Sequence, residues 1–143
     1  MKKAPHQARI KKTLIEESAM STRATYRFIP DDLRFRPVVT VYVHHDGYPE
    51  GAAIYLEDAP TVEKFIRKND RAEVTVRHEV RSDTEYRYDI HRLNFKSYRF
   101  GIKAYKREGY GEDATWSEFF DGSFNSFIEA YKNTPIAKAI NSN

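Results

Sequence analysis

The spacing of apolar residues predicts a chain with several strands and few helices. Alternating polar and apolar residues mark 21–29, 72–80, 84–93 and 97–106 as strands with one buried face. Residues 38–43 (VVTVYV) are mostly β-branched and apolar on both faces, which predicts an inner strand. We expect the first strand and this inner strand to form an antiparallel pair.

Helical spacing appears in three places. A proline separates the patterns at 51–57 and 60–68, which predicts two short helices. A short strand at 115–120 precedes the clearest amphipathic helix, for which we predict an Asp121 cap. The apolar residues of that helix recur at i, i+3, i+4 and i+7: Phe124, Phe127, Ile128 and Tyr131.

These elements predict an α+β fold. We expect an antiparallel sheet of four to five strands with two helices on one face, which is a two-layer sandwich. The strands at 72–80, 84–93 and 97–106 follow one another closely and predict a meander. The uncovered face of the sheet would then be available to a ligand or another subunit.

The length of 143 residues suits one domain with its own core. We assign that domain to 20–133 and expect a C-terminal tail at 134–143. Residues 1–19 form a basic leader. Three interpretations of the leader remain open: a flexible arm, an arm that binds a partner or nucleic acid, or an extension upstream of a start at Met20.

Composition narrows the classes of function. The chain has no Cys, which excludes thiol catalysis and cysteine–zinc sites. No apolar run approaches the roughly 18 residues of a membrane span, and the basic N-terminus lacks the apolar region of a secretory signal. We therefore expect a cytoplasmic protein with no membrane partner. A net charge of +3, with ten Tyr and nine Phe, fits an anionic partner without identifying it.

A polar cluster follows the predicted inner strand. His44-His45-Asp46 ends that strand, and the segment GYPEG then turns the chain into a helix. Polar groups at a strand end that faces a helix N-terminus are a usual site for a small anion. Arg23 would add a guanidinium fork, and Tyr86 or Tyr98 a stacking plane. The predicted ligand-binding residues are Arg23, His44, His45, Asp46, Tyr48, Tyr86, Tyr98 and Arg99.

A structural role competes with this prediction. In that alternative, His44, Asp46 and Tyr48 hold the turn by hydrogen bonds, and Arg23 lies on the surface or pairs with Asp46. Metal binding is disfavoured because His44 and His45 point to opposite faces of a strand. No nucleophile motif is present, so we predict no catalytic residue, no metal and no cofactor.

Nucleic acid is a possible but not a favoured partner. Tyr, Arg and Phe interleave at 86–88 and 98–100, a pattern typical of sheets that bind single strands. The 21 acidic residues nearly balance the 24 Lys and Arg, which would weaken a continuous track for phosphates. One small nucleotide suits the same residues better than a polymer.

Three segments carry a resemblance to a known group: MSTRATY at 20–26, YVHHDGYPEGAA at 42–53 and DTEYRY at 83–88. Over about 20–131, the chain resembles small phage and prophage proteins and is similar to phage anti-Thoeris sponge proteins. The resemblance implies a counter-defence protein that sequesters a cyclic ADP-ribose isomer without cleaving it. No binding residue is transferred from that group.

We therefore expect a homo-oligomeric protein, not an enzyme, that binds a small nucleotide-like anion. The alternative is a counter-defence protein that binds a host protein, a CRISPR complex or nucleic acid. A nucleotide hydrolase is the third possibility, with His45 and Asp46 as unspecific acid–base candidates.

Overall fold

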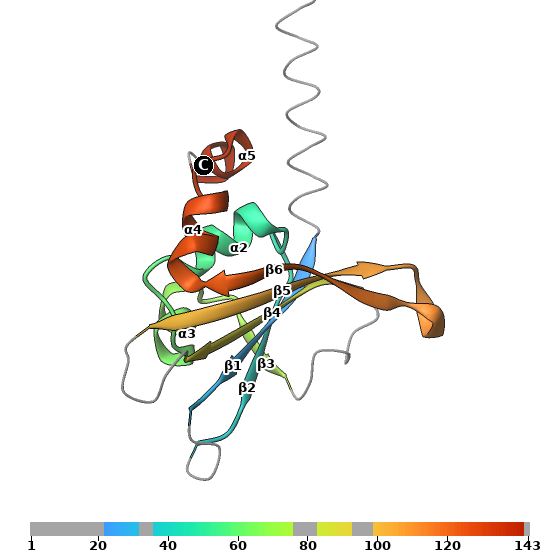
Figure 1. Cartoon of the computed structure of the whole chain (residues 1–143), viewed down its shortest axis with the longest axis horizontal. Coiled ribbons are helices and arrows are strands. Elements are labelled where there is room, and N and C mark those ends of the chain that lie inside the picture. Colours follow the sequence, from blue (N-terminus) through green and yellow to red (C-terminus); the bar gives the residue numbers. More distant parts are fainter. Residues whose placement is uncertain (1–21, 32–35, 76–82, 93–98, 142–143) are drawn as a thin grey trace, which may run out of the picture.

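The computed structural model describes residues 22–31, 36–75, 83–92 and 99–141. Within these ranges six strands form one sheet in the order β3-β2-β1-β4-β5-β6 (Figure 1). The strands are β1 (Arg23–Ile29), β2 (Val39–Val43), β3 (Glu73–Thr75), β4 (Thr84–Arg92), β5 (Phe100–Glu108) and β6 (Thr115–Ser123). The helices are α2 (Pro49–Leu56), α3 (Val62–Lys68), α4 (Phe124–Tyr131) and α5 (Pro135–Asn141), with a 3₁₀ turn η1 (Gly111–Asp113).

The α+β class is confirmed, but the prediction of four to five antiparallel strands is wrong. The sheet has six strands and is mixed, because β1 lies parallel to β4, with Tyr26 opposite Tyr88. The predicted antiparallel pair of β1 and β2 is correct, with Ala24 opposite Val43. The position of β2 between β3 and β1 also confirms the predicted inner strand.

The predicted meander is displaced by one strand. After α3 the chain adds β3 to the outer edge of β2, and β4 then lies on the far side of β1. The observed meander is therefore β4-β5-β6, whose neighbours all pair antiparallel. Alternation identifies a strand but does not tell which strand it will pair with, since pairing joins residues far apart in the chain.

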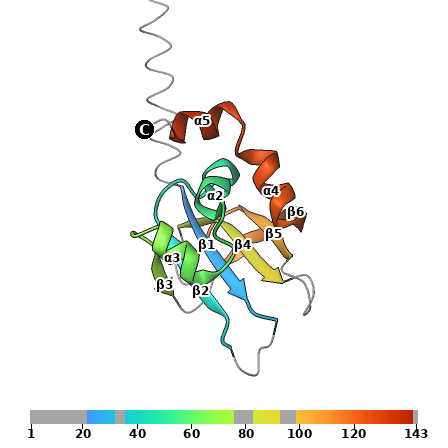
Figure 2. The ribbon, with the colours of Figure 1, turned by 90° about the vertical axis from the view of Figure 1, so that its left-hand side faces the viewer.

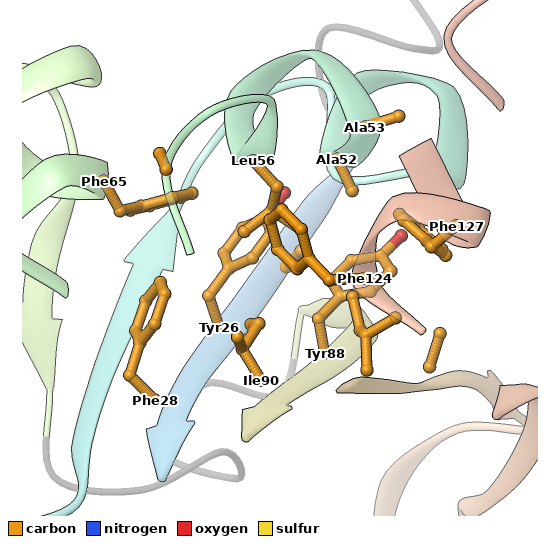
Figure 3. Packing of buried hydrophobic residues seen from close by; sticks show 14 of the residues in the cluster. Tyr26, Phe28, Ala52, Ala53, Leu56, Phe65, Tyr88, Ile90, Phe124 and Phe127 are labelled. Atoms are coloured by element: carbon orange, nitrogen blue, oxygen red, sulfur yellow. The ribbon is translucent and has the colours of Figure 1, made fainter. Parts of the chain in front are cut away.

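The helices cover one face of the sheet, as Figure 1 and Figure 2 show for α2 and α4. Leu56 of α2, Phe65 of α3 and Phe127 of α4 join one buried cluster with the sheet (Figure 3). At its centre the rings of Tyr26 and Tyr88 stack with centroids 5.1 Å apart. Tyr26 also packs against Phe65 of α3, and Tyr88 packs against Phe127 of α4, so this pair of rings joins the sheet to two helices.

Two predictions about the C-terminal part need correction. The expected tail contains helix α5, whose Ala137 is fully buried, and α5 contacts α2. The cap of α4 is Ser123 and not Asp121, because β6 continues to Ser123. The Ser123 hydroxyl accepts a hydrogen bond from the Ser126 amide at 3.1 Å, as an N-cap requires.

The face without helices carries charges that pair across the strands. Arg27 of β1 lies opposite Asp89 of β4, Asp89 opposite Lys103 of β5, and Lys103 opposite Asp121 of β6. The Arg27 guanidinium donates two hydrogen bonds to the Asp89 carboxylate, at 3.1 and 2.9 Å. Alternating signs along this row neutralise one another, so the row does not form a positive track for a polymer of phosphates.

Candidate functional site

Asp46 lies in the turn that joins β2 to α2. Asp46 adopts a left-handed conformation with φ of 56°, which Asp tolerates better than most residues. Its carboxylate accepts hydrogen bonds from the hydroxyls of Tyr48 at 3.3 Å and Tyr55 at 3.1 Å. The Tyr88 hydroxyl donates to the Gly47 carbonyl at 2.6 Å. These bonds tie the turn to both the helix and the sheet.

Glycine is required twice in this turn by close packing. A Cβ on Gly47 would lie 2.7 Å from the Cβ of Ala24, and one on Gly51 would overlap the carbonyl oxygen of Asp46. Pro49 occupies the first turn of α2, where its missing amide hydrogen costs nothing. The DGYPEG segment therefore has a structural explanation in the packing of its own backbone.

The electrostatics of the turn favour neutral tyrosines around a carboxylate. Burial, followed by the charge of Asp46, raises the pKa of Tyr48 and of Tyr55 well above the ordinary value. Both hydroxyls thus keep their protons at neutral pH and act as donors to Asp46. The structural alternative for Asp46 and Tyr48 has direct support in these two hydrogen bonds.

The sheet separates the predicted binding residues. Arg23 and His44 lie on the face without helices, where Arg23 pairs with Asp83 at 3.1 Å and His44 contacts Glu73 at 3.1 Å. Arg23 thus has a carboxylate partner, Asp83, that neither interpretation of the sequence named. The ring of His45 lies 6.3 Å from that of His44.

The other predicted residues lie elsewhere. Asp46 and Tyr48 face α2, and Tyr86 packs at the edge of the helix-covered core. Arg99 lies at the opposite end of the sheet, and Tyr98 falls outside the described residues. The structure therefore places Arg23 and His44 on one face of the sheet. Asp46 and Tyr48 lie together on the other face, so the four residues do not form one site. A binding role for these residues stays a prediction.

A trough lies at the end of the sheet where β1 and β4 finish and β5 begins. Its first compartment has a volume of about 610 Å³ and its second about 790 Å³, and Pro60 and Phe100 border both. Buried Phe28 and Ile90 line the first compartment from the sheet. Ligands often bind beyond the carboxyl ends of parallel strands, and β1 and β4 are the parallel pair in this sheet.

Charges line both compartments of the trough. In the first, Arg36 and Arg92 balance Asp31 and Glu63. The Arg92 guanidinium donates to the Asp31 carboxylate at 3.1 Å and lies 6.0 Å from the centre of the Phe100 ring. Apolar walls with a few charged groups are typical of small-molecule sites.

The second compartment differs in its balance of charge. Among the described residues of its lining, Lys64 and Arg99 accompany one acidic residue, Asp58, so that cations exceed carboxylates by one. Sequence patterns missed this trough because its lining comes from many short segments without a shared motif. Of the predicted binding residues that the structure describes, Arg99 is the one that lies in it.

Comparison with known proteins adds no assignment. No protein-family model, no curated protein and no solved structure matches this chain. Across the described ranges, no three His, Asp or Glu side chains are grouped so that they could hold a metal ion. Among the helices described, none is both long and apolar enough to cross a membrane.

Proposed function

We propose that the protein binds a small nucleotide-like anion in the trough and retains it without cleaving it. The trough is the observation that supports this proposal. Its two compartments fall within the roughly 300–1,000 Å³ of ligand pockets, and they combine an apolar floor with four Lys and Arg side chains among the described residues. Aromatic and guanidinium surfaces suit a base, and cations suit a phosphate.

The resemblance to phage sponge proteins extends the proposal to a biological role. The ligand would then be a cyclic ADP-ribose isomer used as an immune signal, and the protein would act in the cytoplasm of the host cell. A homo-oligomer would hold several ligand molecules per assembly. These statements depend on the resemblance, whereas the proposed site depends on the trough.

The test measures the affinities of two variants, one at each end of the sheet, for a panel of nucleotides that includes cyclic ADP-ribose. We expect Arg92→Ala to weaken binding by about 10- to 100-fold, the range for losing a planar side chain on which a base stacks. Arg23→Ala removes the same charge from the other end and serves as the matched control, with affinity unchanged. The opposite result would place the site beside Arg23 and His44.

The fate of the ligand separates the classes of function. Recovery of intact ligand after denaturing the complex supports retention without cleavage. Accumulation of product would instead establish a hydrolase. Failure to bind any nucleotide on the panel would leave the interaction protein as the better hypothesis.

One observation favours that second candidate. The hairpin of β5 and β6 extends past the other strands in Figure 1, and Tyr110 near its tip is 82% exposed. The Arg107 guanidinium lies 4.9 Å from the centre of the Tyr110 ring, and Gly109 and Gly111 on either side have positive φ. Exposed Tyr and Arg are common at the centres of protein interfaces. If the hairpin binds a host protein, Tyr110→Ala will abolish co-purification of that protein and leave nucleotide affinity unchanged.

A further inference from the structure

We propose that the trough divides its ligand, with the ring in the first compartment and the phosphate in the second, beside Lys64 and Arg99. This inference rests on the proposed function and adds the orientation of the ligand. The two compartments adjoin, since Pro60 and Phe100 border both. One ligand can therefore extend from one compartment into the other.

The first compartment suits a flat ring better than a phosphate. Its floor is formed by Phe28, which is 7% exposed, and Ile90, which is 1% exposed. The charge of Arg92 is offset by Asp31, with which it forms an ion pair at 3.1 Å. A paired guanidinium still presents a planar surface on which a base can stack. An apolar floor beside a neutralised plane favours burial of a base.

The second compartment suits a phosphate. Lys64 of α3 and Arg99 just before β5 both line it, and Asp58 is the one acidic residue among the described residues of its lining. Asn125 adds an amide donor at the start of α4. A phosphate gains charge-assisted hydrogen bonds from ammonium and guanidinium groups, whereas an uncharged sugar gains much less. Among the residues that the structure describes, the excess of positive charge is thus in the lining of the second compartment.

The arrangement predicts which ligands the protein prefers. A nucleoside that carries a phosphate uses both compartments, and the same nucleoside without it uses the first alone. Wild-type protein should therefore bind AMP at least about 10-fold more tightly than adenosine, as one charge-assisted contact implies. Inorganic phosphate at millimolar concentration should compete with AMP and leave adenosine binding unchanged.

The experiment measures AMP and adenosine affinities by calorimetry, or by ligand-observed NMR where binding is weak. In the double variant Lys64→Ala/Arg99→Ala, we expect AMP affinity to fall about 10- to 100-fold and adenosine affinity to stay constant. The AMP-to-adenosine ratio then falls close to one. Lys106→Ala, an exposed substitution in β5 outside the trough lining, is the control for lost charge and should preserve the ratio. Melting temperatures of all variants confirm that they are folded.

Failure of the divided-ligand inference and failure of the proposed function give different results in these measurements. If the double variant loses AMP and adenosine equally, or loses neither, the division of the ligand is wrong although the protein still binds nucleotides. If Arg92→Ala weakens AMP but not adenosine, the ring does not lie in the first compartment. If wild-type protein binds no nucleotide at all, the proposed function itself fails.

Discussion

The two ends of the sheet differ in how their polar groups are used. At the turn between β2 and α2, Asp46 accepts two tyrosine hydroxyls, and a Cβ on Gly51 would overlap the Asp46 carbonyl. At the trough, charged side chains such as Lys64 and Arg99 line an open volume. The turn is stabilised by its own polar groups, while the trough leaves space in which a ligand can reach them.

A distinctive stretch of sequence and a binding site therefore need not lie in the same place. A binding site needs polar side chains and an open volume that a ligand can enter. Alternation, charge and glycine spacing in the sequence indicate the polar side chains but not the open volume. Arg23 and His44 show the same point on the uncovered face, because Asp83 and Glu73 already engage them. A ligand at that end would have to displace these contacts.

The largest expected effect is at Gly51. Gly51→Ala should lower the free energy of unfolding by about 3 kcal/mol, because the new methyl group forces the Asp46 carbonyl to move. Chemical denaturation gives the value. Gly111→Ala in the hairpin has open space around it but φ of 68°, so about 1 kcal/mol is expected from strain alone. Equal losses for the two variants would contradict the tight packing of the turn.

Alkaline pH should destabilise the fold through the buried tyrosines of the core. Burial raises the pKa of Tyr26 and Tyr88 far above the ordinary value of 10.0, so these groups keep their protons in the folded state while they ionise in the unfolded state. Their contribution is complete below pH 10 and is lost as pH rises above it. Each can lower the unfolding free energy by up to about 1.4 kcal/mol per pH unit.

Denaturation curves at several pH values between 9 and 11 test this linkage. Tyr26→Phe should make the decline with pH shallower, because one titrating group is removed. Arg92→Ala at the trough should leave the slope unchanged. A slope that is the same in wild type and Tyr26→Phe would show that Tyr26 does not titrate differently on folding.

The same chemical change should have opposite effects on two stacked rings. Tyr88→Phe removes the 2.6 Å hydrogen bond to Gly47 and should cost about 1 to 2 kcal/mol. The Tyr26 hydroxyl is buried and has no hydrogen-bond partner among the described residues. Tyr26→Phe at neutral pH should therefore be neutral or stabilising by about 1 kcal/mol. A loss of stability in Tyr26→Phe would show that its hydroxyl is satisfied, for example by a buried water.

The smallest effect is expected from deleting residues 2–19. This segment offers few residues that could join a core, so the melting temperature should change by no more than a few degrees. Differential scanning calorimetry of the full and shortened chains decides it. A larger drop would show that the leader packs on the domain or completes an oligomer. The nucleotide affinity of the shortened chain then tells whether ligand binding requires residues 2–19.

Local patterns were enough to predict most of the elements. Alternation located β1, β4 and β5 within a few residues, and the break at Pro60 separated α2 from α3. Apolar spacing located α4, whose Phe124 and Phe127 are buried as expected. These features depend on the period of a strand or helix, which any short window of sequence contains.

The tertiary structure alone decided how those elements combine. The parallel pairing of β1 with β4 joins residues about sixty positions apart, and it converts a predicted antiparallel sheet into a mixed one. The same pairing determines which strand ends meet, and so where the trough forms. Likewise, the sequence showed that Arg23, His44 and Asp46 are polar and near a turn. Only the folded sheet placed Arg23 and His44 on one face and Asp46 on the other, because side-chain direction depends on pairing and on the covering helices.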